Sequence, residues 1–224
     1  MNLIKLYYPS WQTVFYCDNN CPIEILSNLE SLGARIITRQ SNWHQNGMFW
    51  RFKAFEIPDA DYVIIRDTDS RISYRESAAV NQWIVSNKSL HIMRDHPFHK
   101  AFIMGGMWGG KASDILPVLK STEKELRKFS SEYCEDQEFL KKYIYMRFRK
   151  NSTIHDSIYK REFSSRNFPS KRIGLEYVGE SLDNVNCFDE NLRSELQFND
   201  RKFFLKYLII LRDFVRFHIE KNNT

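Results

Sequence analysis

The sequence predicts an α/β domain in which a mostly parallel sheet is flanked by helices. Its 224 residues suit one domain, and an apolar fraction of 42% with 15% aromatic residues is enough to build a core. Short apolar strand patterns also alternate with amphipathic helical patterns, an order that implies right-handed crossovers between parallel strands. The same composition excludes a disordered, collagen-like, low-complexity or disulfide-scaffold protein.

The first half of the chain supplies the alternating elements. Apolar runs that predict strands occur at 3–8, 34–38 and 62–66. The last run is so continuous in Val and Ile that we expect it inside the sheet rather than at its edge. Helices are predicted at 22–32, which starts at a proline and stops before a glycine, and at 48–55.

Later elements follow the same pattern less regularly. Ser73 and Glu76 fit a capping box at the start of a helix, which we expect to end near Ser86. Residues 147–175 are basic and irregular in pattern. The remaining expected elements are strands at 90–93 and 102–104 and helices at 133–146 and 202–219.

The formal charge of +5 is concentrated in two segments. Residues 141–172 carry a net charge of +8 and residues 201–224 a net charge of +4, which leaves −7 for the rest of the chain. Concentrated positive charge favours anionic partners such as phosphates, a nucleic acid or a lipid surface. A solvated helical face is the alternative for each segment.

Cysteine use and terminal pattern predict a cytoplasmic protein. The 4 cysteines include no CxxC pair, so reduced thiols are expected. Residues 1–5 lack a charged region followed by an apolar stretch, and no segment reaches about 20 uninterrupted apolar residues. We therefore expect neither a secretory signal nor a membrane span.

The most informative motif is Asp67-Thr68-Asp69, which follows the predicted strand at 62–66. Ligands of open α/β sheets bind outside the carboxyl ends of the strands, and alternate residues of an extended segment point the same way. Two carboxylates facing one ligand repel each other unless a cation lies between them. A hard divalent ion, Mg²⁺ or Mn²⁺, relieves that repulsion and can also hold a diphosphate. An ordinary turn is the alternative interpretation.

Three of the 6 histidines lie within nine positions, at His91, His96 and His99. Histidine can bind a metal, donate to phosphate or exchange protons, so a zinc cluster is one hypothesis. Because these histidines flank a proline and no cysteine is near, we favour a different arrangement. Arg94 and Asp95 would face a pocket while some of the histidines hold the loop.

Glycine is scarce in this chain, yet four of its 8 glycines lie in the hexapeptide 105–110. A sequence short of glycine uses it where the main chain must come close to something. Gly105 and Gly106 would let a ligand lie against the main chain, and Trp108 would offer it a flat face. The alternative is a tight turn between a strand and a helix.

Two later segments carry further candidates. Asp136 lies at the start of the predicted helix at 133–146, where a carboxylate either stabilises the helix terminus or orients and deprotonates a hydroxyl. His155 and Asp156 lie within the basic segment, whose lysines and arginines could neutralise phosphate.

These features together resemble the GT-A glycosyltransferases, specifically the small single-domain ones of bacteria and large DNA viruses. The resemblance spans roughly residues 1–180 and consists of four motifs in the expected order. These are RDTDSR at 66–71, HIMRDHP at 91–97, GGMWG at 105–109 and EDQ at 135–137. It implies a Rossmann-like GT-A sheet, a nucleotide-sugar donor that is usually UDP-linked, and Mn²⁺ or Mg²⁺ between the DxD motif and the diphosphate. It also implies a hydroxyl of a glycan or glycoconjugate as the acceptor.

The resemblance further implies roles for single residues. It implies metal binding by Asp67 and Asp69, with His155 as the late histidine of the metal shell. The implied donor-binding residues are Tyr7 and Tyr8 near the base, Arg51 near the phosphates, and Asp67, Arg94, Gly105, Gly106 and Trp108. Asp95 and Asp136 would face the sugar or the acceptor as catalytic candidates. Asp136 would be the base of an inverting enzyme, or would only position a hydroxyl in a retaining one.

The C-terminal segment is interpreted without the resemblance. We divide the chain into one glycosyltransferase-like domain over 1–200 and a basic amphipathic helix over 201–224. This helix either covers the core or a second subunit, or lies through 201–221 on an anionic membrane that carries the acceptor.

Two other functions compete with glycosyl transfer. A metal-dependent phosphoryl or nucleotidyl transferase would also use paired carboxylates and a basic segment, although no P-loop or glycine-rich kinase loop is present. A nucleic-acid binder is disfavoured by the negative remainder of the chain and by the lack of a recognised motif, so we expect no nucleic-acid partner.

Overall fold

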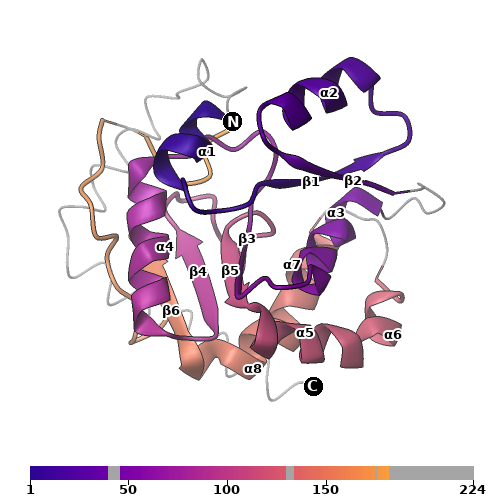
Figure 1. Cartoon of the computed structure of the whole chain (residues 1–224). Coiled ribbons are helices and arrows are strands. Elements are labelled where there is room, and N and C mark those ends of the chain that lie inside the picture. The colour runs from indigo at the N-terminus through magenta and orange to yellow at the C-terminus, as the bar shows by residue number, and fades with distance from the viewer. Residues whose placement is uncertain (40–45, 130–133, 175, 182–224) are drawn as a thin grey trace.

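A computed structural model describes residues 1–39, 46–129, 134–174 and 176–181. The expected helix at 202–219, the domain limit at residue 200 and the membrane contact of 201–221 lie outside the described residues. Within them, strands and helices form the mixed α/β architecture that the sequence predicts (Figure 1).

The main sheet has four strands in the order β3, β5, β4, β6. These are β3 (Tyr62–Ile65), β5 (Trp108–Lys111), β4 (Leu90–Arg94) and β6 (Ser152–Asp156). β5 pairs antiparallel with both of its neighbours, whereas β4 and β6 are parallel. Three strands therefore run in one direction, and the expectation of a mostly parallel sheet is confirmed.

Among the described residues, a second sheet consists of the parallel pair β1 (Val14–Asp18) and β2 (Arg35–Arg39). The crossover between them is α2 (Ile23–Ser31), which begins after Pro22 and is followed by Gly33 at φ +87°. This unit lies to one side of the main sheet (Figure 1). The predictions of a helix at 22–32 and a strand at 34–38 are confirmed.

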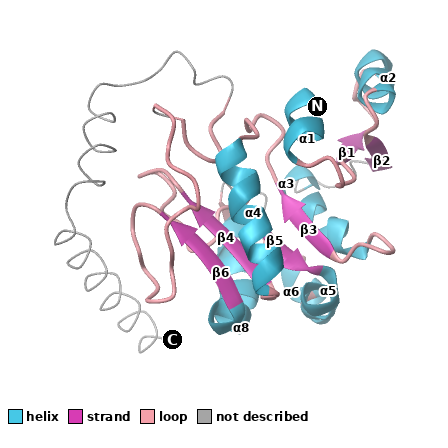
Figure 2. Cartoon of the chain, turned by 60° about the vertical axis from the view of Figure 1, so that its left-hand side comes forward, coloured by secondary structure: helices cyan, strands magenta, loops and turns pink. Residues whose placement is uncertain are grey.

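Helices cover both faces of the main sheet. α4 (Tyr74–Ser86) lies across one face, where Trp83 packs near Ile64 (Figure 2). The other face packs against α5 (Ala112–Ser121) and α7 (Glu135–Phe139). The shorter helical elements are α1 (Asn2–Tyr7), α3 (Asn46–Trp50), α6 (Glu123–Leu126), α8 (Met146–Phe148), the 3₁₀ helices η1 (Arg51–Glu56) and η3 (Arg149–Asn151) and the π-helical turn η2 (Leu140–Tyr145).

Several further predictions agree with these elements. Ser73 caps α4 by accepting a hydrogen bond from the main-chain N–H of Glu76 at 3.3 Å, and the helix ends at Ser86. The strand predicted at 90–93 is β4. Residues 48–55 are helical through α3 and η1, and the described part of 133–146 is helical through α7 and η2.

Other predictions are wrong. Residues 3–7 lie in helix α1 rather than in a strand, Tyr8 follows its end, and the first strand comes later, at β1. A six-residue apolar run does not distinguish helix from strand by periodicity, and here its side chains pack beside Trp83. Residues 102–104 form no strand, and the segment 147–175, expected to be irregular, contains β6.

β3 was expected inside the sheet, but it is a terminal strand of the four-stranded order. Both of its faces are nevertheless covered. Val63 and Ile65 belong to the main core, while Tyr62 and Ile64 pack against the cluster around Trp83. The continuous run of Val and Ile in β3 therefore reflects packing against both faces of the strand. It does not indicate a central position in the sheet.

The direction of the strands brings four chain segments to one edge of the sheet. β3, β4 and β6 end there, and the antiparallel β5 begins there. Asp67, Asp95 and Ser157 follow the three parallel strands, and Gly105 and Gly106 precede β5.

In the described part of the chain, no helix is both long enough and apolar enough to cross a membrane.

Candidate functional site at the carboxyl edge of the sheet

Arg51 joins two of the predicted site carboxylates. Its Nη2 lies 3.1 Å from Oδ1 of Asp67, and its Nη1 lies 3.3 Å from Oδ2 of Asp136. These residues come from η1, from the loop after β3 and from the first turn of α7. The fold thus gathers three predicted site residues that are far apart in sequence into one charged cluster.

Two glycines leave the space in which this cluster lies. A Cβ atom at Gly105 would lie 2.4 Å from both Nη1 of Arg51 and Oδ2 of Asp136. A Cβ atom at Gly106 would lie 2.1 Å from Oδ2 of Asp67. Real Cβ atoms do not approach other atoms so closely, so the predicted close approach of main chain at this hexapeptide is found at Gly105 and Gly106. What it approaches is the carboxylates and the arginine.

Arg66 fixes the loop that carries Asp67 by binding the buried side chain of Glu76 in α4. The Nε of Arg66 donates to Oε1 of Glu76 at 2.6 Å, and the hydroxyl of Tyr8 donates to the same oxygen at 2.9 Å. Sequence reasoning gave Glu76 only a capping role and missed this buried anchor, because the partners lie 10 and 68 residues away.

Asp67 and Asp69 are both exposed to solvent, and Asp67 has 47% of its side chain accessible. Among the described residues, no group of three or more His, Cys, Asp or Glu side chains is placed to hold a metal. A cation at Asp67 and Asp69 would therefore take its other ligands from water or from a bound phosphate, which is the coordination that Mg²⁺ commonly has in proteins.

Asp136 differs from these two carboxylates because its side chain is only 5% exposed. Burial raises the pKa of Asp136, and the positive charge of Arg51 acts in the opposite direction. A buried carboxyl with a raised pKa is suited to accept a proton at Oδ1, because the ion pair with Arg51 is made by Oδ2.

His155 does not join the Asp67–Asp69 pair, so its expected metal role is corrected. It lies on β6, fully buried, where Nδ1 is 2.9 Å from Nε2 of His91 and Nε2 is 2.8 Å from Oε1 of Gln82. Both ring nitrogens are thus occupied by hydrogen bonds. Burial first, then the charge of Arg166, lower the pKa of His155 to about 3.

Asp95 is a structural hub rather than a sugar-facing residue. It is fully buried, and both of its oxygens accept hydrogen bonds from several groups. The donors are Arg75 (2.8 and 2.9 Å), Arg172 (2.8 Å), Ser157 (2.6 Å) and the main-chain N–H of Val178 (3.1 Å). A carboxylate held in this way has no free oxygen for a substrate, so the catalytic prediction for Asp95 is wrong.

Arg94 is likewise internal. Its guanidinium is fully buried and donates to Asp156 at 2.8 Å, to Glu162 and to the carbonyl of Phe102 at 2.8 Å. Burial tends to lower the pKa of Arg94, but the two carboxylates outweigh it and raise it. The predicted contact of Arg94 with a donor is therefore not supported, because its nitrogens serve to join β4 to β6 and the segment after it.

Trp108 does not present a face to a ligand. Its side chain is fully buried in the main core and stacks on Phe55 at a ring separation of 5.3 Å. Gly109 and Gly110 lie beside it within β5, where they pair with β3. The hexapeptide is thus divided: its first two glycines border the charged cluster and the remainder forms a buried strand.

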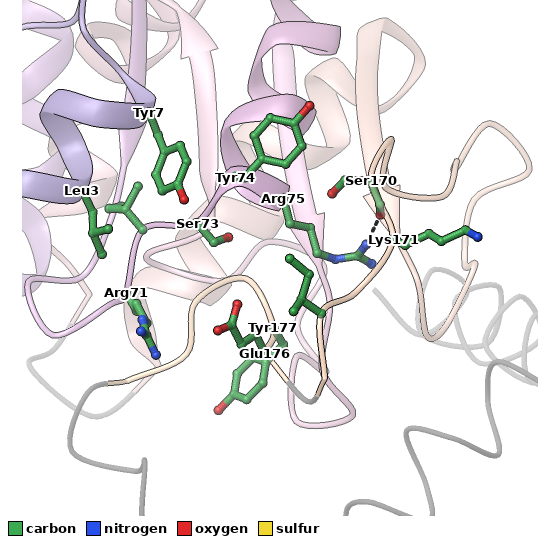
Figure 3. Close-up of a pocket in the computed structure, with 12 residues that line it drawn as sticks. Leu3, Tyr7, Arg71, Ser73, Tyr74, Arg75, Ser170, Lys171, Glu176 and Tyr177 are labelled. Atoms are coloured by element: carbon green, nitrogen blue, oxygen red, sulfur yellow. Dashed lines mark hydrogen bonds between the residues drawn. The ribbon is translucent and has the colours of Figure 1, made fainter.

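The two N-terminal tyrosines have different environments. Tyr8 is buried under the loop of Asp67, so its expected place beside a nucleotide base is not supported. Tyr7 lines a cavity of about 130 Å³ together with Arg71, Ser73 and Tyr74 (Figure 3). Residues of the Arg51–Asp67–Asp136 cluster do not line this cavity. We place the candidate active site at the cluster because its chemistry, rather than its volume, is distinctive.

The three clustered histidines form no metal site in the described part of the chain. His91 stacks on Trp83, and His96 stacks on Tyr177 with ring centroids 4.1 Å apart. Nδ1 of His99 accepts a hydrogen bond from the main-chain N–H of Asp95. His96 and His99 thus lie in the loop after β4 and make contacts within it and with Tyr177, whereas His91 lies within β4 and packs on α4.

Comparison with known proteins yields a distant structural likeness. No family model matches the chain, and no curated protein matches it in sequence. A crystal structure of a glycosyltransferase involved in the glycosylation of the major capsid of PBCV-1 is similar over 64% of this chain and 81% of that chain. Its TM-score is 0.40 and its sequence identity 15%, so the functional assignment rests on the residues of the site.

Proposed function

We propose that the protein is a metal-dependent glycosyltransferase that moves a sugar from a nucleoside-diphosphate donor to a hydroxyl of a glycan or glycoconjugate. The observation that carries this proposal is the convergence of Asp67, Arg51 and Asp136 at the carboxyl edge of the sheet. Open α/β sheets bind their ligands at this edge. UDP is the nucleotide that we expect, following the resemblance of the four motifs to GT-A enzymes.

The charges of the cluster favour a ligand that brings a cation. Asp67 and Asp136 share one guanidinium, that of Arg51, so these three side chains carry a formal charge of −1, and the exposed Asp69 follows two residues after Asp67. A divalent ion would neutralise that charge and let an anionic diphosphate approach. Asp67 and Asp69 fit Mn²⁺ or Mg²⁺ because they supply exposed oxygen ligands of the kind these ions prefer. Such an ion stabilises the negative charge that develops on a leaving diphosphate.

The protein's own residues would share the remaining work. In the transfer, the bond from the sugar C1 to the diphosphate oxygen breaks, a bond from C1 to the acceptor oxygen forms, and the diphosphate leaves with the electron pair. Arg51 would stabilise that leaving group from a fixed position. Asp136 would take the acceptor proton in an inverting reaction. In a retaining one it would hold the acceptor hydroxyl while the proton passes to the leaving diphosphate. Gly105 and Gly106 leave the space in which the side chains of Arg51, Asp67 and Asp136 lie.

Donor cleavage tests this function before the acceptor is known. The full chain is incubated with a panel of UDP-sugars and Mn²⁺, and the products are separated by ion-exchange chromatography. Glycosyl transfer to water or to an added glycan releases UDP, and chelation of Mn²⁺ should stop the release. The competing nucleotidyl transfer would instead cleave between the two phosphorus atoms and release sugar 1-phosphate. Finding that product, or finding no UDP with any donor, would contradict the proposal.

A further inference from the structure

The ion pairs of Arg51 are unequal in their exposure. Asp136 is 5% exposed at its side chain, whereas Asp67 is 47% exposed. An exposed ion pair in water contributes little to stability, whereas breaking a buried one is costly. The ion pair of Arg51 with Asp136 is therefore the one that stays formed, and the ion pair of Arg51 with Asp67 is the one that breaks easily.

The oxygen of Asp67 in this ion pair is also one that a cation would need. Oδ1 of Asp67 accepts from Arg51, while Oδ2 of Asp67 lies against Gly106. Close packing at Gly105 restricts movement of the guanidinium on the side of Asp136. A divalent ion and Arg51 thus compete for the exposed carboxylate, because two cations held on one oxygen repel each other.

We propose that Arg51 is an internal competitor for the metal site, which makes cation binding conditional on the nucleotide. Without nucleotide, a cation that binds Asp67 leaves one guanidinium nitrogen without its partner. With nucleotide present, the released nitrogen of Arg51 pairs with a phosphate oxygen while Asp136 holds the other. The inference rests on the proposed function in that it takes Asp67 as a metal ligand and a diphosphate as the partner.

The consequence is a positive coupling between the two ligands. The nucleotide supplies a phosphate oxygen for the Arg51 nitrogen that the cation displaces, and the cation frees that nitrogen for the phosphate. The coupling is reciprocal by thermodynamic necessity. A protein without the Arg51 guanidinium should bind the cation more tightly by itself but gain less from the nucleotide. A residue that merely stabilises the fold would not produce these opposite changes.

The test measures Mn²⁺ binding to the full chain by electron paramagnetic resonance of the free ion, with and without UDP. Complexes of Mn²⁺ with UDP in solution are subtracted by a protein-free titration. For Arg51→Gln without UDP we expect the Kd for Mn²⁺ to fall roughly two- to fivefold, the range set by losing one exposed ion pair. We also expect UDP to tighten Mn²⁺ binding less in this variant than in the wild type.

Two further variants separate the specific effect from a change in net charge. Arg127→Gln removes a cation that pairs with Glu123 at 2.9 Å on α6, and it should bind Mn²⁺ as the wild type does. Arg51→Lys keeps the charge but lacks the two-nitrogen fork that joins Asp67 to Asp136, so its Kd should lie between those of the wild type and Arg51→Gln. If Arg51→Gln does not fold, Arg51→Lys alone tests the inference through the same Mn²⁺ titration.

The outcomes are distinct. Equal or weaker Mn²⁺ binding by Arg51→Gln and Arg51→Lys, or no binding by any variant, would overturn the inference. The same holds if Arg127→Gln tightens Mn²⁺ binding as much as Arg51→Gln does. The proposed function fails separately: Mn²⁺ and UDP could show the expected coupling while no UDP-sugar is cleaved.

Discussion

A Cβ atom at Gly106 would lie 2.1 Å from Oδ2 of Asp67 and 2.8 Å from its main-chain nitrogen. The first contact could be relieved by rotating an exposed carboxylate, but the second involves main chain on both sides. The position of Asp67 therefore depends directly on the absence of a side chain at residue 106.

Gly106→Ala should displace the loop of Asp67. We expect a stability loss of about 1–3 kcal/mol, typical of inserting a group into a packed site. We also expect a loss of Mn²⁺-dependent UDP binding, because the carboxylate no longer meets the cation in place. Urea unfolding gives the stability, and calorimetric titration with UDP and Mn²⁺ gives the binding.

Gly174→Ala is the matched control for Gly106→Ala. Gly174 has φ +58° and open space around its Cβ position, so alanine there strains the backbone by roughly 1–2 kcal/mol without touching the cluster. This variant should lose stability but bind UDP normally. Unchanged UDP binding by Gly106→Ala would instead mean that Gly105 and Gly106 have a purely structural role.

Asp95→Asn tests the corrected role of Asp95. The amide keeps the shape of the side chain but leaves Arg75 and Arg172 without their buried negative partner. Removing one member of a buried ion pair costs about 3–5 kcal/mol, so we expect a large fall in the midpoint of urea unfolding.

Asp136→Asn provides the comparison, because Asp136 pairs with a single, partly exposed arginine. It should lose much less stability than Asp95→Asn and should lose transfer activity. If Asp95→Asn unfolded at the wild-type urea concentration yet lacked activity, Asp95 would belong to the reacting site after all.

The sequence predicted the elements whose signals are local. Pro22 and Gly33 mark the two ends of helix α2 in the sequence, and Ser73 and Glu76 mark the start of α4. The failures concern contacts with distant parts of the chain: residues 3–7 are helical, and Ile4 and Tyr7 pack beside Trp83. Whether a short apolar run becomes helix or strand is decided by packing that the run itself does not encode.

For the candidate site, the sequence named residues that the fold brings together with Asp67, but it did not show that the named residues divide into two networks. Arg51, Asp67 and Asp136 form the open cluster, whereas Arg94 and Asp95 are saturated by buried partners. Motif letters do not reveal this, because Arg94 and Asp95 have the same chemistry whether buried or exposed. Only the three-dimensional list of hydrogen-bond partners separates the two groups.

The buried pair of His91 and His155 predicts sensitivity to acid. Burial and nearby Arg166 lower the pKa of His155 from 6.5 to about 3 in the folded protein. Below about pH 6.5 the unfolded chain therefore binds a proton at His155 that the folded chain does not, and stability falls with pH until about pH 3.

His155→Gln should remove this proton uptake. The variant loses the hydrogen bond to His91 at neutral pH, but its unfolding free energy should fall by about 1–2 kcal/mol less than that of the wild type between pH 7 and pH 5. Urea unfolding at pH 7, 6 and 5 measures the difference. Parallel pH profiles of the two proteins would mean that His155 titrates normally in the fold.

The most direct measurement is a thermal-shift comparison of the wild type and Asp69→Asn with UDP-, GDP- and dTDP-sugars, with and without Mn²⁺. A ligand at one hundred times its Kd stabilises the folded state by about 2.7 kcal/mol, which is readily detected as a rise in Tm. We predict that Tm rises for the wild type only when a UDP-sugar and Mn²⁺ are both present. Asp69→Asn should keep the wild-type Tm without ligand, because Asp69 is exposed, and should show no such rise. A full Mn²⁺-dependent rise in Asp69→Asn would contradict the proposed metal-dependent donor site.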